Sequence, residues 1–213
     1  MCWNKETSII SFIIGTLINI SVMLYFKNTL FYAFGIVWQW VLMMQLSEYL
    51  IWVDQEGKST NNIGTKSALL FNLTQPIIVF LVLMCITTVP LSFKILSSII
   101  ILLYVSFMFV QLNKVSEYQK VTPTKNCSHL NLKWWNDIKF SGILYCITLF
   151  IIVFLLLRPV NLAIFTLLFV FITLIISSFI YGCGAPSMWC WFVVPFPLLL
   201  GLYYKYFVED KST

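Results

Sequence analysis

Charged residues are scarce in this chain of 213 residues. Asp, Glu, Lys and Arg make up only 10% of the sequence, whereas 60% of the residues are hydrophobic and 17% are aromatic. Soluble domains contain about 25% charged residues, so the composition excludes a soluble domain carried on one anchor. A mean hydropathy of +0.92 predicts instead an integral membrane protein whose main partner is the lipid bilayer.

The chain also lacks a run of basic residues. Its net charge of +5 is distributed over short connections and segment ends, which is a signal of orientation in the membrane rather than of nucleic-acid binding. Neither a basic region nor a small-residue cleavage site flanks the first apolar segment. We therefore expect this segment to stay in the mature chain as the first span, and not to be removed as a signal peptide.

Residues that several classes of membrane protein require are missing. Zinc-dependent membrane hydrolases need several histidines, but the sequence contains only His129, and no GxSxG motif of a serine hydrolase occurs. A retinal protein needs a lysine inside its last span, whereas Lys205 lies at the end of this one. A zinc site of Cys127 and His129 with Cys183 or Cys190 is an alternative that the absence of a CxxC pair disfavours. We predict no enzyme, no bound metal and no cofactor.

Seven apolar segments are long enough to cross a bilayer, which takes about 20 predominantly apolar residues. They comprise residues 8–26, 30–53, 65–89, 91–112, 138–157, 159–181 and 189–207. The connections are tight on one side and longer on the other. Pro90 and Pro159 fit the tight side, because proline ends one helix and can begin the next. The sequence predicts an all-α polytopic membrane protein, a seven-transmembrane-helix bundle forming a single domain over residues 1–213.

Charges and cysteines together predict the orientation of the bundle. The tight connections carry Lys27, Lys94 and Arg158 without acids among them, which is typical of the cytoplasmic side. The longer connections carry more basic residues in total, but mixed with acids, so a raw count favours the opposite orientation. Four cysteines lie on the long-connection side, namely Cys2, Cys127, Cys183 and Cys190. Because thiols gathered there suit an oxidising lumen or exterior, we expect an outside or luminal N-terminus and a cytoplasmic C-terminus.

The four cysteines can pair in three ways. A bridge from Cys183 to Cys190 would hold the last outer connection, and one from Cys2 to Cys127 would join the N-terminus to the largest connection. Alternatively, all four are reduced, buried thiols that behave as small hydrophobic residues. Asn126 begins an N-glycosylation sequon on the same side of the membrane.

The second segment carries polar residues at membrane depth. Gln45, Glu48 and Tyr49 share one helical face, and Glu48 lies about five residues, or roughly 7 Å, inside the outer end. The third segment brings Asn72 and Gln75 to a similar depth. Because an acidic residue in mid-membrane costs about 2.5 to 3.5 kcal/mol on insertion scales, we expect Glu48 to face the bundle interior.

Two interpretations of this polar cluster are open. In the first, a cavity open toward the outside uses Glu48 and its neighbours to bind or conduct a proton, a cation or a small solute. In the second, a protonated Glu48 hydrogen-bonds Asn72 or Gln75 in a helix–helix contact worth about 0.6 kcal/mol. The protein would then be a structural or assembly component of a membrane, with no transport activity.

Four short motifs stand out: MCWN at residues 1–4, MQLSEYLIW at 44–52, QP at 75–76 and WCW at 189–191. Together they resemble an uncharacterised family of multi-pass membrane proteins from giant, nucleocytoplasmic large DNA viruses. The resemblance implies no activity and no catalytic residue. It implies a setting, either the internal membrane of a virion or the host endoplasmic reticulum that supplies it.

Overall fold

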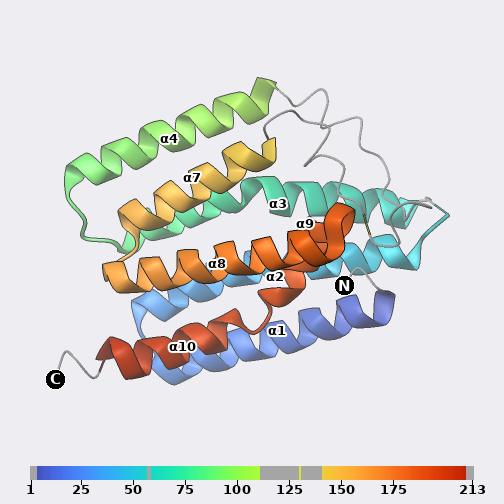
Figure 1. Cartoon of the computed structure of the whole chain (residues 1–213), viewed down its shortest axis with the longest axis horizontal. Coiled ribbons are helices and arrows are strands. Elements are labelled where there is room, and N and C mark those ends of the chain that lie inside the picture. Colours follow the sequence, from blue (N-terminus) through green and yellow to red (C-terminus); the bar gives the residue numbers. More distant parts are fainter. Residues whose placement is uncertain (1–3, 57–58, 111–129, 131–140, 210–213) are drawn as a thin grey trace.

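A computed structural model describes residues 4–56, 59–110, 130 and 141–209 of the chain. All regular elements in these ranges are helices, which confirms the all-α prediction. They are α1 (Lys5–Phe26), α2 (Thr29–Val53), α3 (Ser59–Ile86), α4 (Leu91–Val110), α7 (Ser141–Leu156), α8 (Val160–Tyr181), the 3₁₀ turn η1 (Gly182–Gly184), α9 (Ala185–Phe192) and α10 (Phe196–Phe207). The helices run side by side along one direction, and α2 packs against α1, α3, α9 and α10 (Figure 1).

Within the described ranges, five helices are long and apolar enough to cross a membrane, namely α1, α2, α3, α4 and α8. Their number supports a multi-pass membrane protein. Helix α7 is apolar but has only 16 described residues, and part of the segment predicted at residues 138–157 lies outside the described ranges. The count of seven spans is therefore not confirmed.

The last predicted span, residues 189–207, is not one helix. It is divided into α9 and α10 by a turn at residues 193–195, in which Phe196 N donates to Val193 O at 3.1 Å. Proline lacks the N–H that continues a helical ladder, and Pro195 and Pro197 stand at this point. Figure 1 shows the result: α9 lies against α8, whereas α10 lies beside α1.

The tight connections form as the sequence predicts. Asn28 caps α2 by accepting a hydrogen bond from Phe31 N at 2.9 Å, and Lys27 ends α1 in the left-handed conformation with φ of 49°. Helix α4 starts directly after Pro90, and α8 starts directly after Pro159, as expected for a residue that needs no hydrogen bond at a helix start.

Helices α2 and α3 approach each other closely at Gly64. A Cβ atom at this position would lie 2.8 Å from the backbone oxygen of Ser47 and 2.9 Å from the backbone nitrogen of Ile51. Since neither backbone atom can rotate away, only glycine fits here. Small residues at helix crossings are typical of membrane bundles, where close backbone approach gains van der Waals contact.

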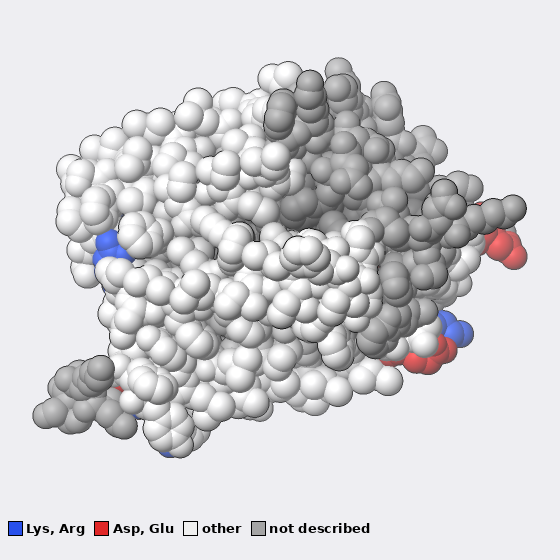
Figure 2. Space-filling view, in the orientation of Figure 1, with Lys and Arg blue, Asp and Glu red and all other residues white. Residues whose placement is uncertain are grey.

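The outside of the bundle is apolar. Large hydrophobic side chains such as Phe179, Val110 and Phe109 are 88%, 74% and 72% exposed. On the face drawn in Figure 2, the coloured charged atoms lie toward the two ends, and the described atoms between them are white. Exposed apolar surface of this extent would be unfavourable in water, so it is explained by contact with lipid.

Candidate functional site

The polar residues of α2 and α3 that the sequence singles out lie inside the bundle. Gln45 and Glu48 are both 0% exposed, and Asn72 and Gln75 are each 2% exposed. Tyr49 is only half-buried. Gln45 and Glu48 belong to the buried residues of α2, and Asn72 and Gln75 to those of α3. A carboxyl group and three amides thus occupy the interior of a bundle whose outside is apolar.

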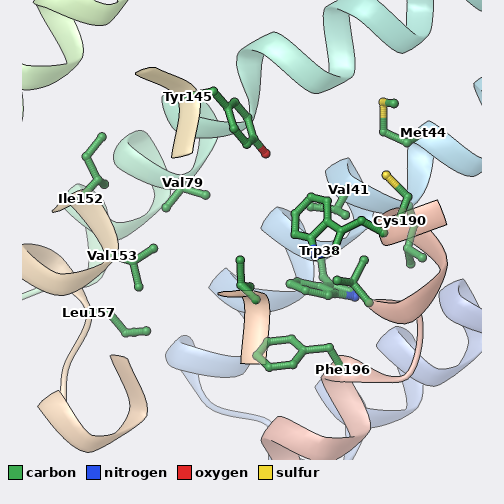
Figure 3. Packing of buried hydrophobic residues seen from close by; sticks show 14 of the residues in the cluster. Trp38, Val41, Met44, Val79, Tyr145, Ile152, Val153, Leu157, Cys190 and Phe196 are labelled. Carbon is green, nitrogen blue, oxygen red and sulfur yellow. The ribbon is translucent and has the colours of Figure 1, made fainter. Parts of the chain in front are cut away.

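Helix α7 adds a tyrosine to this group. Tyr145 is 2% exposed, and its hydroxyl donates a hydrogen bond to Oε1 of Gln75. In Figure 3 the Tyr145 side chain extends from α7 toward the middle of the bundle. Its hydroxyl satisfies one end of the Gln75 amide, while the other end, Nε2, has no hydrogen-bond partner in the described part of the chain.

The amide of Gln45 is the least satisfied group of the site. Neither its Nε2 nor its Oε1 has a hydrogen-bond partner among the described residues, and both atoms are buried. A buried polar group without a partner costs about 1–3 kcal/mol, and native structures that contain one usually hold a water or ion beside it. The site around Gln45 therefore has hydrogen-bonding capacity that the described chain does not use.

Two amides between α1 and α2 are satisfied. Asn19 on α1 donates to Gly35 O at 2.9 Å and to Oε1 of Gln39 at 3.4 Å, and Gln39 donates to Oγ1 of Thr16 at 3.1 Å. These contacts join α1 to α2 and are typical interhelical hydrogen bonds. Gln39 and Gln45 lie on the same helix, so the contrast shows that the surroundings of each amide decide whether it has a partner.

Helix α9 contributes to the site through its packing against α2 and α8. Cys190 is 2% exposed and lies near enough to Glu48 for the two side chains to interact electrostatically. Two contacts hold α9 on α8: Trp189 Nε1 donates to Oγ1 of Thr173 at 3.0 Å, and Ser177 Oγ donates to Ala185 O at 2.7 Å. Thr173 and Ser177 thus position α9.

A cavity of about 70 Å³ begins at Gln75 and lies between α2, α3, α7 and α8. Its wall is almost entirely apolar, and Trp38, Val41, Val79, Val153 and Leu157 are drawn around it in Figure 3. The hydroxyl of Thr166, which also lines it, has no hydrogen-bond partner among the described residues. One water-sized group needs about 10–15 Å³, and apolar cavities hold apolar molecules rather than water, so the space suits a small, largely apolar molecule.

The position of this cavity differs from the prediction of a polar pocket in the outer half. The polar residues lie toward the end of the bundle where the N-terminus lies, but the cavity extends from them toward the end where the C-terminus emerges and is mostly apolar. The cause is the break in the last span. Met188, Trp189 and Cys190 of α9 are buried and fill the half with the polar residues, whereas α10 turns away toward α1 and leaves space in the other half.

The predicted disulfide between Cys183 and Cys190 is not supported. Cys190 is a buried thiol, as α9 carries it into the bundle, and no disulfide forms among the described cysteines. Cys2, Cys127, Asn126 and the side chain of Cys183 lie outside the described residues. Nor do the described residues contain a group of three His, Cys, Asp or Glu side chains that could hold a metal.

Thr166 and Trp38 were not predicted as part of a site. Thr166 belongs to a buried stripe of α8 with Leu162, Val170 and Thr173, and its spacing of three or four residues is visible in the sequence. The stripe identifies a buried face but not a cavity, because a cavity depends on which helices stand opposite.

No protein-family model, curated protein or solved structure matches this chain.

Proposed function

We propose that this multi-pass membrane protein binds a small solute inside its helix bundle, in the cavity that begins at Gln75 and next to the polar cluster of Gln45, Glu48, Asn72 and Gln75. The observation that supports the proposal is the amide of Gln75, which lines the cavity and whose buried Nε2 has no hydrogen-bond partner within the described ranges. A solute with an acceptor oxygen would bind this donor and offset the cost of its burial. The unpartnered amide of Gln45 lies one helical turn from Val41, which also lines the cavity.

A small solute fits the surroundings better than a bare cation. A cation site needs several oxygen ligands, whereas the wall of the cavity is almost entirely apolar. Pockets of this kind, apolar with a few polar groups at one end, are typical of small-molecule sites. Glu48 adds a proton-binding group beside the amides, so uptake of the solute together with a proton is part of the proposal.

The test is ligand-dependent stability of the purified protein in detergent micelles. We would compare K⁺, Na⁺ and sodium butyrate as probes, because a ligand that binds only the folded state raises the free energy of unfolding. The expected result is stabilisation by butyrate that disappears in Gln75→Leu, which removes the amide lining the cavity, and that changes its pH dependence in Glu48→Gln. Gln39→Leu is the matched control, since that amide already has partners, and it should keep the response to butyrate.

A second candidate function is a structural or assembly role in a membrane. It is supported by the hydrogen bonds of Asn19 and Gln39, which join α1 to α2 without forming a cavity. If no probe stabilises the wild type and Gln45→Leu is simply a more stable protein, the structural role replaces solute binding.

The proposed orientation has an outside or luminal N-terminus and a cytoplasmic C-terminus. Lys27, Lys94 and Arg158 lie at the end of the bundle where the C-terminus emerges, and basic residues favour the cytoplasm. The resemblance to the giant-virus family supports a virion membrane or the host endoplasmic reticulum as the location. A membrane-impermeant thiol reagent applied to intact cells tests the orientation, and labelling of outer-side thiols only from the cytosol would contradict it.

A further inference from the structure

A second hollow opens at the C-terminal end of the bundle. It has a volume of about 380 Å³ and is lined by polar residues that include Asn28, Thr87, Arg158 and Tyr204. The elements that form it are the start of α2, the ends of α3 and α7, and α10, and Figure 1 shows these helix ends where the C-terminus emerges. We call this hollow the inner vestibule.

The inner vestibule and the central cavity meet at two leucines. Leu83 on α3 and Leu157 after α7 line both spaces. Both side chains are buried, with 6% and 1% exposure. A constriction made of apolar side chains blocks water and ions while it is closed, and it opens by small side-chain movements.

We infer that the inner vestibule is the entrance to the central cavity, that Leu83 and Leu157 form its gate, and that the route admits small anionic or neutral amphipathic molecules rather than cations. The inference rests on the proposed solute binding and adds the side of entry and the class of solute. It replaces the outward-facing entrance that the sequence predicts.

The charge at the entrance comes from Arg158. Its guanidinium donates to the backbone oxygens of Phe154 at 3.1 Å and Leu157 at 2.8 Å, and it lies 5.6 Å from the ring centre of Phe93. These contacts hold the positive charge beside the gate. None of the described residues that line the vestibule is acidic, so the local field repels cations and attracts anions.

The chemistry of the cavity agrees with a solute that carries an acceptor oxygen. The Gln75 Nε2 and Thr166 hydroxyl groups are both able to donate, and neither has a partner in the described part of the molecule. The rest of the wall is apolar. A carboxylate or carbonyl oxygen on a short apolar body would satisfy these donors and fill the remaining space.

The gate is tested with single-cysteine reporters in the full-length protein in micelles. Val79→Cys reports on the cavity, and Thr87→Cys reports on the vestibule. Each reacts with a methanethiosulfonate carrying a sulfonate group, and protein without the reporter gives the background rate of the native thiols. We expect slow reaction at Val79→Cys, and reaction faster by about tenfold or more when Leu157→Ala is added. Leu168→Ala is the matched control, because Leu168 is 54% exposed and lines neither space.

The entrance charge is tested at Thr87→Cys by comparing the sulfonate reagent with one that carries a trimethylammonium group. The anionic reagent should react faster by about tenfold, and the preference should vanish in Arg158→Gln. Lys205→Gln is the control, since Lys205 lies at the same end of the bundle, donates to the Tyr25 hydroxyl at 2.9 Å and does not line the vestibule.

Either of two results overturns the inference. One is a rate at Val79→Cys that Leu157→Ala leaves unchanged or that Leu168→Ala raises equally. The other is a charge preference that survives in Arg158→Gln. If Leu157→Ala fails to fold, Leu83→Val carries the same prediction. The labelling rates require no solute, so they test the route by themselves, whereas the Gln75→Leu experiment tests solute binding. Failure of one proposal is therefore distinguished from failure of the other.

Discussion

The hydroxyl of Tyr145 on α7 donates a hydrogen bond to Oε1 of Gln75 on α3. Because this contact engages the acceptor end of the amide, the donor end, Nε2, is the atom left for an occupant of the cavity. This hydrogen bond thus joins two helices. It also leaves a hydrogen-bond donor, and not an acceptor, for a molecule bound at this end of the cavity.

Tyr145→Phe should weaken solute binding as well as folding. The loss of the hydroxyl should lower the free energy of unfolding by about 0.5–1.5 kcal/mol, and the freed Gln75 amide should rotate and lose its selectivity for acceptor oxygens. Tyr104→Phe is the control, since its hydroxyl donates to Leu73 O at 2.7 Å and does not contact Gln75. Chemical unfolding in micelles with and without butyrate measures both effects, and an equal response of the two variants to butyrate would contradict the role of Tyr145.

Gly64→Ala should separate α2 from α3. The added methyl would lie 2.8 Å from the Ser47 backbone oxygen, and overpacking of this kind costs about 1–3 kcal/mol. At Gly201 the corresponding contact is 2.9 Å to Cε2 of Phe26, a ring that can rotate away, so Gly201→Ala should cost less. The measurement is the unfolding free energy of each variant in micelles, and equal costs would show that the α2–α3 crossing is not constrained at the backbone.

Asn19 and Gln39 should be energetically coupled. Their amides share a hydrogen bond of 3.4 Å, and double-mutant cycles in membrane proteins average about 0.6 kcal/mol with a maximum of about 1.7. The cycle uses Asn19→Leu, Gln39→Leu and the double variant, with unfolding free energy as the readout. Gln45→Leu combined with Asn19→Leu is the control and should show additive effects. Coupling of zero between Asn19 and Gln39 would mean that their contact does not hold α1 to α2.

Cys190 should be a thiol that reacts only after unfolding. It is 2% exposed within the bundle, whereas Cys85 is exposed on the surface of α3. Alkylation by N-ethylmaleimide in micelles, followed by peptide mass analysis, should modify Cys85 in the native protein and Cys190 only in denaturant, without prior reduction. Recovery of Cys190 in a disulfide-linked peptide would contradict the free thiol and support the disulfide that the sequence predicts.

Much of the fold is encoded in local sequence features. The lengths and hydropathy of the apolar segments identify the five long helices, and Pro90 and Pro159 mark the starts of α4 and α8. These features are local, because a helix satisfies its own backbone within the segment and a bilayer demands about 20 apolar residues. The break at residues 193–195 was not predicted, because Pro195 and Pro197 lie in an apolar stretch that is long enough for one span.

The site was recognised only in part. Glu48, Gln45, Asn72 and Gln75 were singled out because polar side chains are costly in lipid, and all four are indeed buried. The sequence could not tell which of them have partners. Gln39 and Gln45 are the same residue type on the same helix, yet the first has hydrogen bonds to α1 and the second has none within the described chain.

Hydropathy and spacing by themselves determined that this protein is a bundle of membrane helices with polar residues turned inward. Both features reflect the free energy of transferring side chains between water, lipid and the protein interior, and this free energy can be judged from a single segment. Only the tertiary structure decided that α10 turns away to α1, that a cavity is left below Gln75, and that Leu83 and Leu157 stand between it and the inner vestibule. The physical reason is that cavities and hydrogen-bond partners arise between helices far apart in the chain, and the periodicity of one helix contains no information about its neighbours.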